Sequence, residues 1–71
     1  MNEAEIGKRL RMLRGDKSRQ EVSDAIGVSM SALAMYENGE RIPRDTIKVK
    51  IANYYKKTVQ EIFFDEICHN M

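Results

Sequence analysis

The chain has 71 residues, of which 42% are hydrophobic and 32% charged, and its formal net charge is +1. This length indicates one small domain, which buries only about 60% of its unfolded surface and therefore needs every helix or a partner to contribute. No apolar run approaches the ~20 residues of a membrane span, and the polar, acidic N-terminus is unlike a signal peptide. The lone Cys68 cannot form an internal disulfide, so we expect a reducing, cytoplasmic setting.

Charge is divided unevenly along the chain. Residues 1–57 carry 12 basic and 8 acidic side chains, whereas residues 58–71 carry no basic and 3 acidic ones. A basic body with an acidic end is typical of a protein that meets phosphate with its body and keeps its tail away. Ordinary solvated surface gives the same pattern, so charge alone leaves both interpretations open.

A first helix is expected over residues 2–14. Asn2 at its start can accept a hydrogen bond from an otherwise unpaired backbone N–H. Its apolar stripe, at helical spacing, consists of Ile6, Leu10 and Leu13. Gly7 lowers the helix propensity and would allow close approach of a neighbouring helix, and Gly15 ends the segment.

Two short helices joined by a tight turn follow, over residues 18–26 and 29–38. Ser18 and Glu21 have the spacing of a capping box at the start of the first one. The apolar stripe of that helix consists of Val22, Ala25 and Ile26. Gly27 stands where the turn needs a residue that tolerates positive φ.

The second helix of this pair has its own start and stop signals. Ser29 can cap it, and Val28 and Leu33 have the spacing of a hydrophobic staple, which would fix the angle of entry. Gly39 occupies the position after the helix where a left-handed conformation is favoured. The whole layout predicts a helix-turn-helix, whose second helix enters the major groove of DNA.

A fourth helix is expected to have Pro43 in its first turn, and a fifth to open with a capping box of Thr58 and Glu61. The buried face of the fourth helix is expected to consist of Ile47, Ile51, Ala52 and Tyr55. The short fifth helix presents Val59, Ile62 and Phe63, with Phe64 on a different side. No segment alternates with period two, so the predicted fold class is all-α.

Together these motifs resemble the lambda-repressor-like family of Cro/repressor (XRE) DNA-binding domains, over roughly residues 5–64. The matching motifs are Ile6-Gly7-x-x-Leu10-Arg11, Ser18-Arg19-x-Glu21-Val22, Ile26-Gly27-Val28-Ser29, Tyr36-Glu37-Asn38-Gly39 with Pro43, Ile51-Ala52, and Val59-x-x-Ile62-Phe63. The resemblance implies a compact five-helix fold, sequence-specific operator binding, usually as a homodimer, and control of transcription. We expect residues 1–66 to form this domain and residues 67–71 a C-terminal tail.

The outer face of the helix over residues 29–38 is the candidate base-reading surface. At about 100° per residue, Leu33 and Tyr36 face the core. The candidate base contacts on the other side are Met30, Ser31, Ala34 and Met35. Since none of these is Arg or Gln, readout would depend on Ser31 hydrogen bonds, on apolar contacts with thymine methyl groups and on DNA shape. Plain solvent exposure is the alternative interpretation.

Polar and basic side chains around this helix are the candidate phosphate contacts. They are Arg19, Asn38, Arg41 and Arg44. Arg19 stands where the family usually has Gln, and its guanidinium can still reach a phosphate. Each of the four can also be an ordinary surface side chain, and we expect about three of them to contact the backbone.

Two further expectations concern pairing. The resemblance implies that Arg11 forms a partly buried ion pair with Glu37, the alternative being two unrelated surface charges. A homodimer is expected to use the fifth helix and tail, through Phe63, Phe64 and Ile67. In the alternative, Ile62 and Phe63 close the monomer core.

Other classes of function find little support in the sequence. The adjacent Cys68 and His69 cannot by themselves build a tetrahedral metal site, so no metal is expected. No cofactor and no small-molecule ligand is inferred from the sequence. An enzyme is not expected either, because the pair lacks an orienting partner. The rival to a DNA-binding regulator is a protein-interaction module, similar to an antirepressor. The apolar outer face of the helix over residues 29–38 favours that rival.

Overall fold

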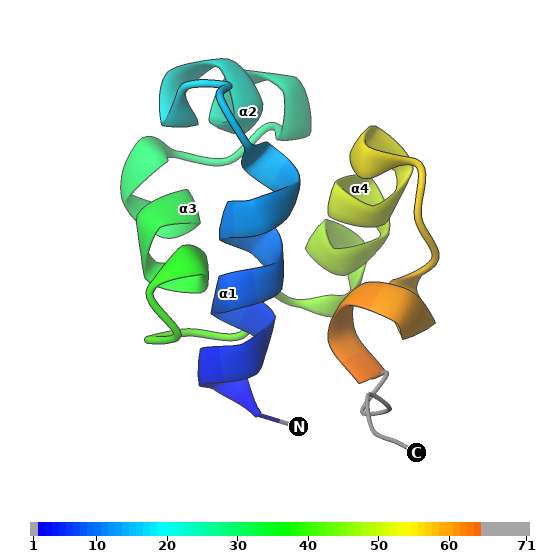
Figure 1. Cartoon of the computed structure of the whole chain (residues 1–71). Coiled ribbons are helices and arrows are strands. Elements are labelled where there is room, and N and C mark those ends of the chain that lie inside the picture. Colours follow the sequence, from blue (N-terminus) through cyan, green and yellow to red (C-terminus); the bar gives the residue numbers. More distant parts are fainter. Residues whose placement is uncertain (1, 65–71) are drawn as a thin grey trace.

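The computed structural model describes residues 2–64, which fold into four α-helices and a final π-helical turn, with no strand (Figure 1). These elements are α1 (Glu3–Arg14), α2 (Arg19–Ile26), α3 (Met30–Glu37), α4 (Asp45–Tyr55) and η1 (Gln60–Phe64). The predicted all-α class is confirmed, and all five expected helices are present.

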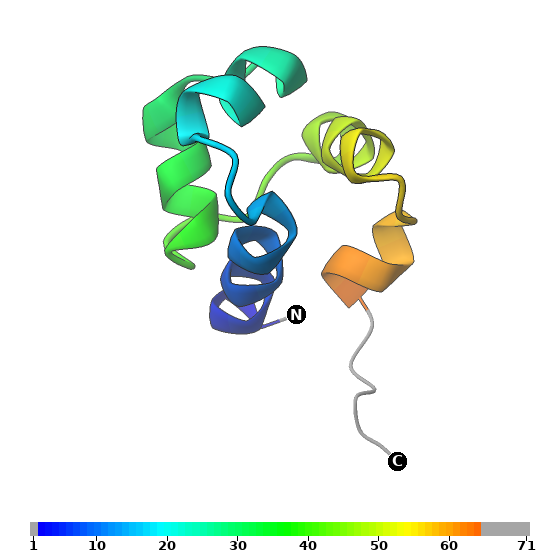
Figure 2. The same ribbon diagram turned by 45° about the horizontal axis from the view of Figure 1, so that its top comes forward.

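The helix α1 lies at the centre of the molecule, with α3 on one side of it and α4 and η1 on the other (Figures 1 and 2). It packs against α3 and η1, while α2 packs against α3 and α4. Every element contributes to one core, which consists of Ile6, Leu10, Val22, Ile26, Leu33, Tyr36, Ile51, Ala52, Ile62 and Phe63. The short α2 and α3 therefore depend on tertiary packing for their stability.

The predicted helix starts are capped as expected. The side chains of Asn2, Ser18 and Ser29 each accept a hydrogen bond from the backbone N–H three residues later, at 3.0 to 3.1 Å. Thr58 and Glu61 form a reciprocal capping box, in which each side chain accepts from the other residue's backbone N–H. The backbone N–H of Thr58 donates to the carboxylate of Glu61 and thereby holds the pKa of Glu61 below its usual value.

Two local expectations are wrong. Pro43 is buried in the loop before α4 and not in the first turn, because Arg44 stays extended (ψ 164°) and the helix begins at Asp45. Ala25 is exposed, because the buried arc of α2 extends from Val22 and Ile26 toward a buried serine. That residue is Ser23, and its buried hydroxyl donates a hydrogen bond to the backbone carbonyl of Gln20 at 3.1 Å.

The close approach expected at Gly7 is confirmed. A Cβ atom there would overlap the backbone carbonyl oxygen of Glu37 and lie 3.0 Å from the backbone nitrogen of Gly39. Gly39 itself has φ +74°, the left-handed conformation predicted for it. The middle of α1 is thus packed directly on the backbone at the end of α3, which fixes the orientation of α3.

Candidate nucleic-acid interface

The helix α3 is held by its inner side and presents its outer side to solvent. Leu33 and Tyr36 are buried, as predicted, and Val28 packs against the same core from the turn before the helix. That turn passes through Gly27 in the left-handed conformation (φ +89°). The α2–turn–α3 unit therefore has the geometry of a helix-turn-helix whose second helix has a free face.

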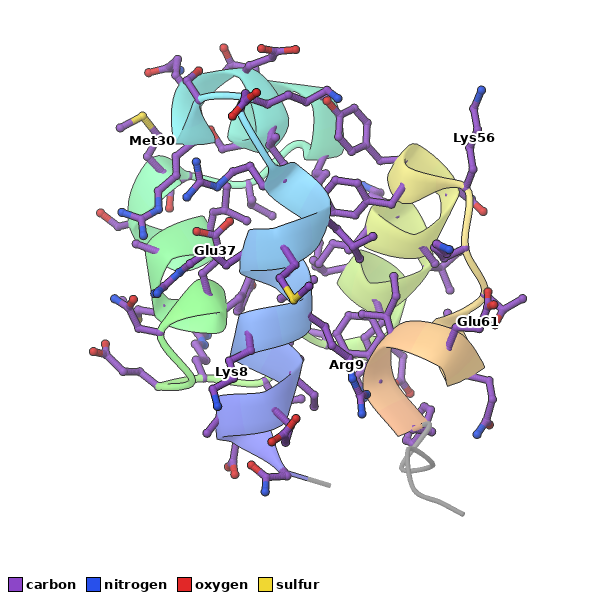
Figure 3. The ribbon with its side chains drawn as sticks, viewed as in Figure 1. Lys8, Arg9, Met30, Glu37, Lys56 and Glu61 are labelled. Carbon is purple, nitrogen blue, oxygen red and sulfur yellow. The ribbon has the colours of Figure 1, made fainter. Side chains whose placement is uncertain are left out.

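The four candidate base contacts occupy this free face to different extents. Met30 is 44% exposed, Ser31 is exposed, and Ala34 and Met35 are half-buried. Figure 3 shows Met30 at the edge of the molecule, where α3 begins next to α2. The first turn of α3 is thus the most accessible part of the uncharged face, as required of a helix that enters a groove by its N-terminal end.

The candidate phosphate contacts lie at the start of α2 and in the segment from the end of α3 to the start of α4. Asn38, Arg41 and Arg44 are exposed, at the end of α3, in the following loop and at the N-cap of α4. The side chain of Arg44 makes no capping hydrogen bond with α4. Arg19, the first residue of α2, is 36% exposed in its side chain. The uncharged helix face is thus accompanied by cations in the segments that precede and follow it in the chain.

The predicted ion pair between Arg11 and Glu37 is wrong. Arg14 donates from Nε to Oε2 of Glu37 at 2.7 Å, and Arg19 donates from Nε to Oε1 at 3.0 Å. Arg11 instead donates to the side-chain oxygen of Asn38 at 3.0 Å. The reason is geometric, because Arg11 lies opposite the C-cap of α3, while Arg14, nearly one turn further along α1, lies opposite the carboxylate.

The residue of this cluster that the sequence analysis missed is therefore Arg14. Arg11 and Arg14 are three residues apart and share one face of α1, so spacing alone does not distinguish them. The carboxylate they compete for has no exposed surface, since the relative exposure of the Glu37 side chain is 0%. Arg14 also donates to the backbone carbonyl of Lys17 at 2.8 Å, so this cluster joins α1, the turn after it, α2 and α3.

Burial and charge shift the pKa values of two groups at this cluster. The hydrogen bond to Glu37 raises the pKa of Arg14 above its usual value. Burial, followed by the negative charge of Glu37, raises the pKa of Tyr55 to about 12. The Tyr55 hydroxyl is buried and has no hydrogen-bond partner within residues 2–64. The ion-paired cluster thus has an unsatisfied phenol beside it on α4.

The candidate dimer interface divides into a buried and an exposed part. Phe63 is only 2% exposed, so its assignment to a dimer interface is wrong, and it closes the monomer core instead. Phe64 is 46% exposed, with the ammonium of Lys48 5.1 Å from the centre of its ring. Ile67 lies outside the described residues. Since η1 lies across α1 from α3, Phe64 is remote from the free face of α3 (Figures 1 and 2).

Other chemical features of residues 2–64 are sparse. An open groove of about 340 Å³ runs between α1 and η1, with Met12, which is 81% exposed, on its rim. No group of three His, Cys, Asp or Glu side chains suited to a metal ion occurs in this part of the chain. Cys68 and His69 lie outside it. None of the described helices is long and apolar enough to cross a membrane.

Comparison with known protein families identifies the kind of domain. A family model described as helix-turn-helix matches residues 8–62, which covers most of α1, the whole α2–turn–α3 unit, α4 and the start of η1. No curated protein and no solved structure matches the chain at a significant level.

Proposed function

The chain belongs to the Cro/repressor-type helix-turn-helix (XRE) family, a family of DNA-binding regulator domains and not of enzymes, and we propose that it is a cytoplasmic, sequence-specific transcriptional repressor of the phage or mobile-element type. Its partner in this role is a double-stranded operator, approached by the outer face of α3.

One observation carries this proposal. The free face of α3 is uncharged, whereas Arg19, Arg41 and Arg44 supply cations from the three segments next to α3 in the chain, which are the start of α2, the loop after α3 and the N-cap of α4. Base edges in a groove are uncharged and the phosphates lie along both rims of the groove, so this distribution matches a duplex. Met30, Ser31, Ala34 and Met35 then read bases, while Asn38 and the three arginines hold the backbone.

The direct test is binding to duplex DNA over a range of salt concentrations. A helix-turn-helix that makes several phosphate contacts shows an observed association constant that falls steeply with salt. Selection of preferred sites from a random DNA pool then supplies the operator. Binding that is absent, or that does not depend on salt, would refute the proposal.

The roles of the two residue sets separate in a second experiment. Ser31→Ala and Met35→Ala should change the relative affinities of operator variants, by at most the roughly 1–3 kcal/mol of a good contact. The matched control is Arg44→Ala, which should weaken binding to all sequences about equally. If the two α3 variants keep the wild-type preference, α3 does not read bases.

We also propose that the operator is an imperfect palindrome bound by a homodimer. One recognition helix reads only a few base pairs, whereas two-fold pairing would double the site and place half-sites about 34–36 Å apart. We expect the interface to use Ile67 and the exposed Phe64, whose element η1 lies across α1 from α3. In sedimentation, Phe64→Glu should be monomeric and bind the operator weakly, and a wild-type protein that is monomeric on its operator would contradict the dimer.

A second function is favoured by one specific feature. The exposed part of α3 presents the apolar Met30 and no charge, which also suits contact with another protein, as in an antirepressor. Steep salt dependence and a selected DNA site would exclude this alternative. A stable complex with another regulator, formed without any affinity for DNA, would establish it.

A further inference from the structure

We propose that Glu37 is a positioning residue for DNA binding, because its buried carboxylate holds the guanidinium of Arg19 by one edge and directs the other edge to a backbone phosphate. This inference rests on the proposed function and concerns how one of its phosphate contacts is built. Glu37 is the last residue of α3, and its side chain lies between α3 and α1 (Figure 3). Because this side chain has no exposed surface, it cannot itself contact a DNA backbone.

The two arginines that share Glu37 are held in different ways. Arg14 is only 17% exposed, and it uses both Nε and Nη1, which donate to Glu37 and to the carbonyl of Lys17. Arg19 is 36% exposed and is attached through Nε alone, at 3.0 Å. The structure records no hydrogen bond from its terminal nitrogens to residues 2–64. Arg14 therefore serves the fold, and Arg19 faces outward.

Arginine is suited to this double role by its shape. A guanidinium carries five N–H donors in a rigid plane, and a donor used on one edge leaves the opposite edge free for a second anion. Two parallel hydrogen bonds from that edge match the geometry of a phosphate. A carboxylate that holds Nε also removes much of the rotational freedom that the long side chain would lose on binding.

The charges of the cluster permit a phosphate nearby. One carboxylate is shared by two guanidinium groups, so the cluster keeps a net positive charge, and the more exposed member is Arg19. Arg19 begins α2, and its guanidinium lies against the last residue of α3. A phosphate on the rim of a groove that contains α3 would meet this arginine.

Replacing Arg19 with lysine separates the geometric role of the guanidinium from the role of its positive charge. A lysine ammonium keeps the positive charge, but it lacks a planar fork with two edges, so it cannot hold Glu37 and clamp a phosphate in the same geometry. The decisive variant is therefore Arg19→Lys. Its partners are Arg19→Ala, Glu37→Gln and the double variant Arg19→Ala/Glu37→Gln.

The matched control removes one positive charge far from the site. Lys56 is exposed at the end of α4, on the opposite side of the molecule from Met30. It has a left-handed conformation (φ 58°), which asparagine tolerates, so Lys56→Asn should fold normally. At 0.1 M salt its charge is largely screened from the site.

The experiment measures the affinity of each folded variant for one duplex, by fluorescence anisotropy at several salt concentrations. Arg19→Ala should lose affinity on the order of tenfold and lower the log–log salt slope by about 1. Arg19→Lys and Glu37→Gln should lose nearly as much, the double variant should bind no worse than Arg19→Ala, and Lys56→Asn should bind like the wild type.

Two results would overturn the inference. If Arg19→Lys binds like the wild type, charge alone suffices, and this comparison stands even if Glu37→Gln does not fold. If folded Glu37→Gln binds with unchanged or higher affinity, the carboxylate has only a structural role. In both cases the wild type still binds DNA, whereas a wild type without salt-dependent binding would remove the proposed function itself.

Discussion

Two charged side chains are buried within residues 2–64, and they are stabilised in opposite ways. Glu37, beside α1 and α2, has no exposed surface and two charge-assisted hydrogen bonds, at 2.7 and 3.0 Å. Lys48, on α4, is 9% exposed in its side chain and lies 3.4 Å from the fully solvated Asp45. Its ammonium otherwise faces aromatic rings, 5.8 Å from the ring centre of Phe63 and 5.1 Å from that of Phe64.

This difference indicates which end of the molecule depends on charge. Glu37 joins three elements, so its loss would leave two guanidinium groups without a counter-charge. Among the described residues, the ammonium of Lys48 has only one long ion pair and two aromatic rings as partners, so an apolar side chain could replace it. We therefore expect the helix-turn-helix end to be intolerant of substitution at its buried charge and the η1 end to be tolerant.

The largest effect is expected from Glu37→Leu. It should lower the free energy of unfolding by about 3–5 kcal/mol, because breaking one side of a buried ion pair strands the other charge. Adding Arg14→Met should recover much of the loss, as measured by urea unfolding in a double-mutant cycle. Strict additivity would contradict the pairing. Arg11→Met is the control, and it should cost at most about 1 kcal/mol since it removes a surface hydrogen bond.

A smaller loss is expected from Gly7→Ala. Its methyl group would overlap the backbone carbonyl oxygen of Glu37, so α1 and α3 would have to separate. Overpacking of this kind costs about 1–3 kcal/mol, and alanine's better helix propensity offsets only part of it. The neighbouring exposed Lys8→Ala serves as control and should stay within about 0.5 kcal/mol of wild type. A stabilised Gly7→Ala protein would refute the close approach of the two helices.

Of the three substitutions, Lys48→Met, which removes the buried charge near η1, should change the stability least. Lys48→Met should change the free energy of unfolding by no more than about 1 kcal/mol, in either direction, because its contacts are one long ion pair and two cation–π interactions. Thermal unfolding of Lys48→Met beside Glu37→Leu measures the contrast directly. Equal losses in the two variants would mean that both ends depend on charge.

The smallest effect is a dependence on high pH. Burial and the nearby Glu37 raise the pKa of Tyr55 to about 12, so folding favours the neutral phenol. Its contribution to stability is complete below the ordinary tyrosine pKa of about 10 and is lost as pH rises from there toward 12. Tyr55→Phe should lose less stability than the wild type over this interval. At neutral pH its stability should be close to that of the wild type, because it removes a hydroxyl that has no hydrogen-bond partner among residues 2–64. Identical pH profiles would contradict the shift.

Local signals in the sequence were sufficient to predict most of the fold. Caps at Asn2, Ser18 and Ser29, and glycines at 27 and 39, act over three or four residues, so their roles could be assigned without knowing the packing. The close approach at Gly7 was also predictable, because a glycine inside a helix usually has a packing reason.

Side-chain partners at a distance were harder to predict. Arg11 and Arg14 lie on the same face of α1, so the sequence does not show which of them pairs with Glu37. The pairing depends on how far α1 extends past the end of α3. Likewise, Phe63 and Phe64 are adjacent apolar residues, and only the path of η1 decides that the first is buried and the second exposed. The burial of Ser23 in place of Ala25 has the same origin, because tertiary packing sets the centre of the buried arc.

The central claim is that the α3 end of the molecule, and not the η1 end, meets DNA. Backbone amide chemical shifts, followed by NMR during titration with the selected duplex, test it most directly. We predict the largest changes at the first turn of α3, at Arg19 and around Arg44, with little change at Lys57 and Glu61 beside the groove. Changes concentrated at that groove, with α3 unaffected, would contradict the account.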